Sequence, residues 1–360
     1  MSQRTAGSRG VSVSPATTIG LDVGDRWSAF CVLDEMGAVA ERGRVRTRAE
    51  DVTTAFTAYG PVRIVLEVGT HSPWLSRLLR AGGHEVIVAN ARRVRLIAES
   101  DQKDDRTDAE QLARLGRLDP GLLSPIRHRG ERAQRDLAVL RARDCLVRSR
   151  TALVNHVRGA VKAFGSRLPT CSTESFPQKV KDSIPEALVP ALAPLLETIA
   201  DLTQRIRAVE RAVVATCERD YPETRLLRQV PGVGPITSLA FVLTVEDPVR
   251  FTKSREIGPY LGLVPRRRQS GHSAPELHIT KTGDRQLRRL LVGCAHYILG
   301  PFGPDSDLRR WGLSHSPAGR GARKRTTVAV ARRLAVMLHH LWVSGEVYEP
   351  LHRATPAPAA

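Results

Sequence analysis

The sequence predicts a mixed α/β N-terminal domain, a long helical segment and a mainly α-helical C-terminal domain. Three observations predict this organisation. Short β-branched runs alternate with helical patterns from about residue 17 to residue 120. Apolar residues then recur at helical spacing along two long stretches. A Pro-Gly turn finally opens a third, basic region. At 360 residues the chain has room for two or three domains with a sizeable core.

The N-terminal domain is expected to begin with three antiparallel strands, with Gly37 in a hairpin turn. Strands and helices then alternate. In order, the elements are expected at Thr17–Val23, Trp27–Asp34, Val39–Thr47, Ala49–Tyr59 (helix), Val62–Glu67, Pro73–Ala81 (helix), His84–Ala89, Arg92–Glu99 (helix) and Arg106–Leu118 (helix). Three antiparallel strands followed by βαβ units are the ribonuclease H-like arrangement. Open sheets of this kind place their chemistry at the carboxyl ends of strands.

Four acidic residues fall where this arrangement would gather them. Asp22 ends the first strand, within Gly-Leu-Asp-Val-Gly, and Glu67 ends the fourth strand. Asp105 and Asp108 are three residues apart at the head of the last helix, so they share one helix face. Each acid alone is equally well explained as a turn former or a helix cap. The order of all four favours a metal site.

Carboxylates brought together repel each other, and divalent metal relieves that repulsion. Mg²⁺ prefers oxygen ligands, and two such ions can hold the attacking and leaving oxygens of a phosphate. We therefore expect two Mg²⁺ ions at these four acids, with Mn²⁺ able to substitute.

The composition indicates a polyanionic partner. Lys and Arg total 55 against 37 Asp and Glu, which gives a net charge of +18 and a pI near 10.7. Between Arg250 and Arg333, 18 Lys and Arg face 5 Asp and Glu, and most of the bases are arginine. The planar fork of arginine suits phosphate oxygens. Aromatic residues make up only 4%, which argues against base stacking as the main mode of nucleic-acid binding.

The five cysteines are widely spaced and form no Cys-x-x-Cys pair, which argues against a disulfide framework and a zinc ribbon. No apolar run is long enough for a membrane span. A cytoplasmic protein is therefore expected. Five segments are predicted: a disordered leader (1–15), the α/β domain (16–125), the helical segment (126–222), the C-terminal domain (223–345) and a tail (346–360).

Helical spacing runs without a break over Glu131–Ala163 and again over Pro185–Cys217. Two long amphipathic helices joined by a Pro/Ser-containing stretch predict an antiparallel hairpin or coiled coil. A compact helical domain is the alternative. This part is expected to be a spacer or an oligomerisation element, since it carries no obvious chemistry.

The C-terminal domain opens with Val-Pro-Gly-Val-Gly-Pro over Val230–Pro235. This is the pattern of a helix-hairpin-helix, in which backbone N–H groups hold a phosphate, although a plain tight turn has the same residues. Helices are expected at Arg285–Leu299 and from about Arg323 to Val343. The candidate nucleic-acid-binding residues are Gly232, Gly234, Arg266, Arg267, Arg268, Lys281, Arg285, Arg288 and Arg289.

Taken together, these motifs resemble the DEDD transposases of the IS110/IS1111-type insertion sequences over nearly the whole chain. The N-terminal motifs at Asp22, Glu67 and Asp105–Asp108 resemble that family's RuvC-like domain. The C-terminal half resembles its transposase domain through Pro-Gly-Val-Gly, Gly-Leu-Val-Pro, Ser-Gly and Thr-Lys-Thr-Gly-Asp-Arg-Gln-Leu-Arg. Asp104 departs from the family pattern, where Thr or Asn is more usual.

The resemblance implies a serine nucleophile, which we place at Ser270. From the residues alone, a Ser-Gly pair in a basic loop is also an ordinary turn, and Ser273 is a near neighbour. The resemblance further implies double-stranded DNA as substrate, guidance by a structured RNA, and a dimer or tetramer in which serine and acids meet between subunits. It implies a bacterial, nucleoid-associated protein.

The sequence therefore predicts a Mg²⁺-dependent DNA recombinase that works through a phosphoserine intermediate. The first alternative is a metal-dependent nuclease of the Holliday-junction-resolvase kind, in which water attacks. A sugar-kinase or actin-like ATPase is suggested by Gly20–Gly24, but the required second Asp-x-Gly loop is not found before the helical region. A non-catalytic nucleic-acid scaffold is a further alternative.

Overall fold

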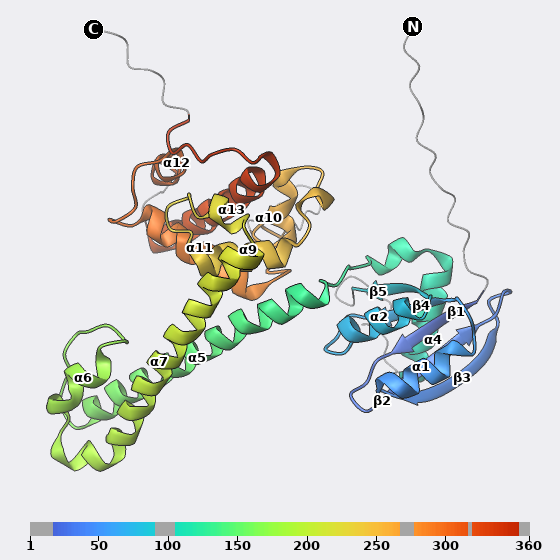
Figure 1. Cartoon of the computed structure of the whole chain (residues 1–360), viewed down its shortest axis with the longest axis horizontal. Helices are drawn as coiled ribbons and strands as arrows, with labels where there is room; N and C mark the ends of the chain where they lie inside the picture. The colour runs from blue at the N-terminus through green and yellow to red at the C-terminus, as the bar shows by residue number, and fades with distance from the viewer. Residues whose placement is uncertain (1–16, 91–104, 267–276, 316–318, 353–360) are drawn as a thin grey trace, which may run out of the picture. The chain divides into compact units, whose positions relative to one another are not determined.

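The computed structural model describes residues 17–90, 105–266, 277–315 and 319–352, and the chain forms two compact units, Met1–Arg129 and Gly130–Ala360 (Figure 1). The predicted leader and the predicted helix Arg92–Glu99 lie outside the described residues. Within those residues, no helix has the length and apolar character needed to cross a membrane.

The N-terminal unit contains a five-stranded mixed sheet, in the order β3-β2-β1-β4-β5. Its strands are β1 (Thr18–Asp22), β2 (Trp27–Leu33), β3 (Val39–Arg46), β4 (Arg63–Glu67) and β5 (Glu85–Ala89). The first three strands pair antiparallel, whereas β4 runs parallel to β1 and β5 parallel to β4. The predicted mixed α/β sheet is therefore confirmed, with each strand within one or two residues of its expected bounds.

Helices cover both faces of this sheet. On one face, α1 (Ala49–Thr57) and α2 (Ser72–Ala81) contribute Phe56 and Leu75 to a core with the inward side chains of the strands. On the other face lies α4 (Asp105–Leu118), followed by a short 3₁₀ turn at Pro120–Leu123. Strand residues alternate between the two faces, as the pleat requires.

Helix α4 runs antiparallel to β1 and β4. Its first half meets β1, because an added Cβ on Gly20 would lie 1.9 Å from the carbonyl oxygen of Ala109. Its second half meets the start of β4, where buried Arg63 donates from Nη1 to the carbonyl oxygen of Gly116 at 3.0 Å. The head of α4 is therefore directed toward the carboxyl ends of both strands.

Replacing Gly20 with Ala is expected to destabilise the N-terminal unit by about 3 kcal/mol, because the clash is with backbone that cannot move aside. The added Cβ would also lie 2.6 Å from the amide nitrogen of Ala113. Denaturant unfolding of the full chain measures the loss. Gly69→Ala is the matched control, since nothing lies within 4 Å of the added atom. Equal stability of the two variants would contradict this packing of α4.

The C-terminal unit begins with two long helices that pack antiparallel, α5 (Glu131–Ala163) and α7 (Val189–Asp220) (Figure 1). Cross-helix contacts fix the direction, because partner numbers fall along α7 as they rise along α5. The contacts are Arg132–Asp220, Arg143–Glu210 and Arg150–Thr203. Between them lie α6 (Phe176–Val180) and 3₁₀ turns at Lys181–Ser183 and Glu186–Leu188.

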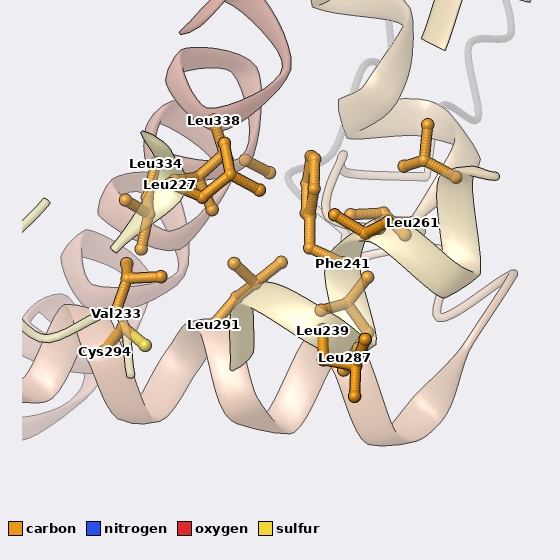
Figure 2. Packing of buried hydrophobic residues seen from close by; sticks show 14 of the residues in the cluster. Leu227, Val233, Leu239, Phe241, Leu261, Leu287, Leu291, Cys294, Leu334 and Leu338 are labelled. Atoms are coloured by element: carbon orange, nitrogen blue, oxygen red, sulfur yellow. The ribbon is translucent and has the colours of Figure 1, made fainter. Parts of the chain in front are cut away.

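The remaining helices of this unit share one core with the near ends of α5 and α7. They are α8 (Thr224–Leu227), α9 (Pro235–Val245), α10 (Ile257–Tyr260), α11 (Arg285–Leu299), α12 (Asp307–Ser314) and α13 (Arg320–Ser344), with 3₁₀ turns at Pro248–Arg250 and Ser254–Glu256. Figure 2 shows Phe241 of α9 among leucines of α11 and α13. Leu137 and Leu140 of α5 belong to the same core. The predicted boundary between segments 126–222 and 223–345 stays a prediction.

Candidate active site

Two of the predicted acids lie side by side at one edge of the sheet. Leu21 of β1 is in register with Leu66 of the parallel strand β4, so Asp22 and Glu67 follow at neighbouring positions. Leu21 and Leu66 point into the α1–α2 core. By alternation, Asp22 and Glu67 point toward the α4 face, and both are partly buried.

The head of α4 brings the other two acids to the same edge. Asp108 is partly buried, and its Oδ1 is inaccessible to solvent. Asp105 is the first residue of α4, but its side chain lies outside the described part. Among the side chains that are described, no group of three or more His, Cys, Asp or Glu is close enough to hold a metal ion. The donor set itself consists of carboxylate oxygens, which suit a hard divalent cation.

The turn after Asp22 is held by close backbone contacts. An added Cβ on Gly24 would lie 2.2 Å from the carbonyl oxygen of Trp27, so only glycine fits here. The Thr47 hydroxyl donates to the carbonyl oxygen of Gly24 at 2.9 Å, and the Thr47 amide donates to that of Arg26 at 3.0 Å. The turn is therefore fixed to the end of β3, and Asp22 has a rigid support.

A histidine joins the loops that follow β1 and β4. The Trp74 indole N–H donates to His71 Nδ1 at 3.1 Å, so His71 Nε2 carries the proton and donates to Asp25 Oδ1 at 3.2 Å. Asp25 follows β1 and His71 follows β4. The pair ties together the two loops that carry Asp22 and Glu67, a contact that sequence reasoning missed.

A second unforeseen contact supports the loop after Glu67. Buried Ser72 lies with its Oγ 2.9 Å from the carbonyl oxygen of Gly69 and 2.8 Å from His128 Nε2. Burial lowers the pKa of the His128 imidazole. The positive charges of Arg80, Arg77 and Arg129 lower this pKa further. Because Ser72 Oγ is enclosed by these partners, the pair holds the loop and does not present a nucleophile.

In the C-terminal unit, two motifs that are distant in sequence pair with each other. The Thr280 amide donates to the Val264 carbonyl oxygen at 2.9 Å, and the Arg266 amide to that of His278 at 3.0 Å. Gly262 takes a φ of 66°, and an added Cβ there would lie 2.3 Å from the amide nitrogen of Thr282. The Gly-Leu-Val-Pro and Thr-Lys-Thr-Gly motifs therefore form one compact element. Figure 2 shows Leu261, beside the first motif, in the core next to Phe241.

Arg288 holds this element together. Its Nη1 donates to the carbonyl oxygen of Leu261 at 3.1 Å and also to that of Thr282. The side chain is half-buried. The sequence assigned Arg288 to nucleic-acid binding, whereas these contacts give it a structural role; its contact with nucleic acid stays a prediction.

Replacing Arg288 with Ala is expected to cost about 2–4 kcal/mol of stability, because two backbone carbonyls lose a charged donor. Lys is expected not to rescue, since its ammonium nitrogen lies one bond nearer the main chain than the Nη1 that makes both contacts. Thermal or denaturant unfolding measures both, with exposed Arg285→Ala on the same helix as the control. Unchanged stability together with weaker DNA binding would instead make Arg288 a direct nucleic-acid contact.

The other predicted nucleic-acid-binding residues divide into four groups. Arg266, Lys281 and Arg285 are exposed, and Lys281 has a φ of 55°, which is unusual for a residue other than glycine. Arg289 is bonded to Asp144 of α5. Gly232 (φ 88°) and Gly234 are exposed in the turn between α8 and α9. Arg267 and Arg268 lie outside the described residues, as does Ser270, the predicted nucleophile.

Comparison with known proteins relates both halves of the chain to one kind of enzyme. Residues 19–165 match the family DEDD_Tnp_IS110, described as "Transposase", and residues 224–306 match "Transposase IS116/IS110/IS902 family". A "Probable family 20 transposase" of Pseudomonas aeruginosa is 30% identical over 301 residues, which cover 81% of this chain and 87% of the relative.

Two further relatives are named as transposases of insertion sequences. The transposase for insertion sequence element IS1111A of Coxiella burnetii is 27% identical over 350 residues, or 94% of this chain and 92% of that protein. The transposase for IS1328 of Yersinia enterocolitica is 29% identical over 289 residues, or 79% of this chain and 84% of that protein.

Proposed function

Because this chain belongs to the IS116/IS110/IS902 family of transposases, we propose that it excises and inserts its own mobile element by serine-mediated DNA strand exchange. The protein is a transposase, and hence an enzyme that cleaves and rejoins DNA. The observation that carries the proposal is the meeting of Asp22 and Glu67 at adjacent strand ends, with the head of α4 directed to the same edge. This arrangement supports a ribonuclease H-like, RuvC-like catalytic domain.

Family membership implies dependence on a divalent metal. We assign the metal ligands to Asp22, Glu67, Asp105 and Asp108, and the metal to Mg²⁺, two ions per site, with Mn²⁺ as a substitute. When bound, the metal would supply positive charge to the phosphate and to the departing 3′ oxygen. The rigid β1–β2 turn and the His71–Asp25 contact support the acids by fixing the loops that carry them.

The proposed nucleophile is Ser270. Its Oγ attacks the scissile phosphorus and loses its proton to solvent or a base, while the bond from phosphorus to the 3′ oxygen breaks and that oxygen takes up a proton from solvent. The products are a 5′-phosphoserine link and a free 3′ hydroxyl. The 3′ hydroxyl of a partner strand then attacks the phosphoserine and releases the serine. Each step therefore replaces one phosphodiester bond with another, and no bond is hydrolysed. Exposed Arg266, at the start of the Ser270 segment, supports this role by supplying charge for phosphate.

The proposed partners are DNA, a guide RNA and further copies of this chain. The Val-Pro-Gly-Val-Gly turn before α9 is proposed to hold a DNA phosphate through Gly232 and Gly234. A structured guide RNA is proposed to select donor and target by base pairing, while the protein supplies sequence-independent phosphate contacts. The α5–α7 pair is proposed to join protomers of a dimer or tetramer, in a bacterial, nucleoid-associated complex.

An excision assay tests the function directly. Cells would carry the element, including its non-coding ends, with the protein supplied separately, and the rejoined donor junction and circular element would be sequenced. Precise junctions that require both the protein and the non-coding ends are expected. Junctions that form without the non-coding ends would contradict the proposal that a guide RNA from those ends is required. Breaks without rejoining would favour the resolvase-like nuclease.

A further inference from the structure

A tryptophan on the N-terminal sheet is exposed and flanked by two arginines. Trp27, the first residue of β2, keeps 44% of its surface exposed. The guanidinium carbons of Arg44 and Arg46, both on β3, lie 5.6 and 5.4 Å from the centre of its indole ring. These distances are typical of cation–π contacts. We call these three residues the Trp–Arg platform.

The platform lies on the same face of the sheet as the acidic site. Across the antiparallel strands, Asp22 is in register with Ala29, and Ala29 with Arg44. Residues directly opposite in antiparallel strands point to the same face, so Arg44 and Asp22 share one row. Their strands are two apart, or about 10 Å. Trp27 and Arg46 form the next row, at the carboxyl side of β1.

The two platform arginines differ from a third arginine of the same strand and face. Arg42 bonds to Glu110 of α4 at 2.6 Å, and Glu110 also binds Arg114. Within the part of the chain that the structure describes, no carboxylate lies within ion-pair distance of Arg44 or Arg46. Both are exposed on the edge strand. Their charges are therefore available to an anionic ligand, whereas the charge of Arg42 is paired with Glu110 of the same chain.

We propose that the Trp–Arg platform binds an unpaired stretch of the DNA strand that is cut at the acidic site. A base would stack on the Trp27 ring, and Arg44 and Arg46 would contact the adjoining phosphates. At the rise of about 3.4 Å per nucleotide that a strand has in a duplex, the roughly 10 Å between the positions of Asp22 on β1 and Arg44 on β3 corresponds to about three nucleotides. The identity of the strand rests on the proposed function, since exchange of a 3′ hydroxyl requires strands that have separated near the scissile phosphate.

A purely structural role for the platform makes different predictions. Arginines on an edge strand discourage pairing with another sheet, and their stems cover an aromatic ring. In that case, replacing Trp27 lowers stability and leaves nucleic-acid binding unchanged. The two roles are separated by measuring binding and unfolding on the same variants.

The test uses the full chain and a fluorescent single-stranded oligodeoxynucleotide in EDTA, so that no cleavage is needed. Trp27→Ala is expected to weaken binding roughly 5-fold to 100-fold, and Trp27→Phe to restore most of it. Arg44→Gln with Arg46→Gln is expected to lower the slope of log affinity against log salt by about 1.4. Quenching of tryptophan fluorescence on binding is expected to diminish in Trp27→Phe.

Matched controls are available on the same chain. Met36, at the other end of the β2–β3 hairpin, is 89% exposed, so Met36→Ala removes exposed apolar surface away from the acidic edge. Arg205 and Arg207 of α7 are paired with Asp201 and Glu174, so replacing both with Gln removes two charges that are already neutralised. Neither control is expected to alter binding by as much as twofold.

Three results would overturn the proposal. Unchanged affinity in Trp27→Ala, with a lower unfolding midpoint, would make the platform structural. If Trp27→Ala lowered the affinity for a blunt duplex as much as the affinity for the single strand, stacking of an unpaired base would be excluded. If Trp27→Ala lowered the affinity for a single-stranded RNA of the same sequence more than the affinity for the DNA, the platform would be assigned to RNA binding. Failure of the proposed catalysis is distinguishable because this binding test needs no cleavage. Excision at the wild-type level by Asp22→Asn would overturn the catalysis, whereas the oligonucleotide affinity of Trp27→Ala would still report on the platform.

Discussion

Replacing Asp22 with Asn is expected to reduce DNA cleavage and excision by roughly a thousandfold or more. The change keeps the shape of the side chain but removes a negative charge from the edge where Asp22, Glu67 and the head of α4 meet. Metal binding is lost with it, because a neutral amide is a poorer ligand for a hard cation. Glu67→Gln is expected to behave in the same way.

Two measurements check this prediction independently. Junction sequencing reports excision, and Mn²⁺ titration followed by electron paramagnetic resonance reports metal affinity without any reaction. Glu110→Gln is the matched control, since Glu110 is an acid on α4 whose charge is used by Arg42 and Arg114. These hydrogen bonds lower the pKa of Glu110. We expect the control to keep both metal binding and excision.

The unfolding midpoint of Asp22→Asn is expected to stay the same or to rise when no metal is present, because one of several neighbouring like charges is removed. Loss of excision accompanied by a falling midpoint would attribute the effect to folding. Normal Mn²⁺ affinity in Asp22→Asn would contradict the assignment of Asp22 as a ligand.

The sheet and its acidic edge were predictable because both depend on local patterns. Alternating β-branched runs marked the strands, and an acid ended each of the two strands that become neighbours. Parallel pairing then brings Asp22 and Glu67 together without further information. Gly20 was not identified from the sequence as the residue that lets α4 lie against β1, because that role appears only when the helix is in place.

Contacts between distant segments were not predictable from the pattern. Arg288 looked like one more basic residue in a basic region, and only the fold shows its guanidinium donating to the carbonyls of Leu261 and Thr282. The His71–Asp25 and Ser72–His128 contacts likewise join loops that the sequence separates. No spacing rule identifies such partners, because the contact depends on the folded chain.

One helix start was also misplaced for a physical reason. The sequence predicted a helix from Pro185, but the residues Glu186–Leu188 form a 3₁₀ turn and α7 begins at Val189. Pro190 lies in the first turn of α7, where its missing N–H costs nothing. The apolar pattern continues across this break, so periodicity alone does not reveal it.

Replacing Ser270 with Ala is expected to abolish the covalent link between protein and DNA and to reduce recombination roughly a thousandfold or more. The alanine variant lacks the only oxygen that the proposed mechanism uses to hold the cut strand. Denatured complexes would be probed for DNA attached to the protein. The attached end should be the 5′ end, resistant to a 5′ exonuclease, while the released end should carry a 3′ hydroxyl that a polymerase extends.

Ser273→Ala is the matched control, because it removes a hydroxyl from the same short segment. If the adduct were retained in Ser273→Ala and absent in Ser270→Ala, the attacking oxygen would be the hydroxyl of Ser270. The reverse result would move the nucleophile to Ser273 and leave the recombinase mechanism intact. Cleavage that survives both changes, without any adduct, would overturn the phosphoserine intermediate. It would favour the alternative mechanism, in which activated water cuts the strand.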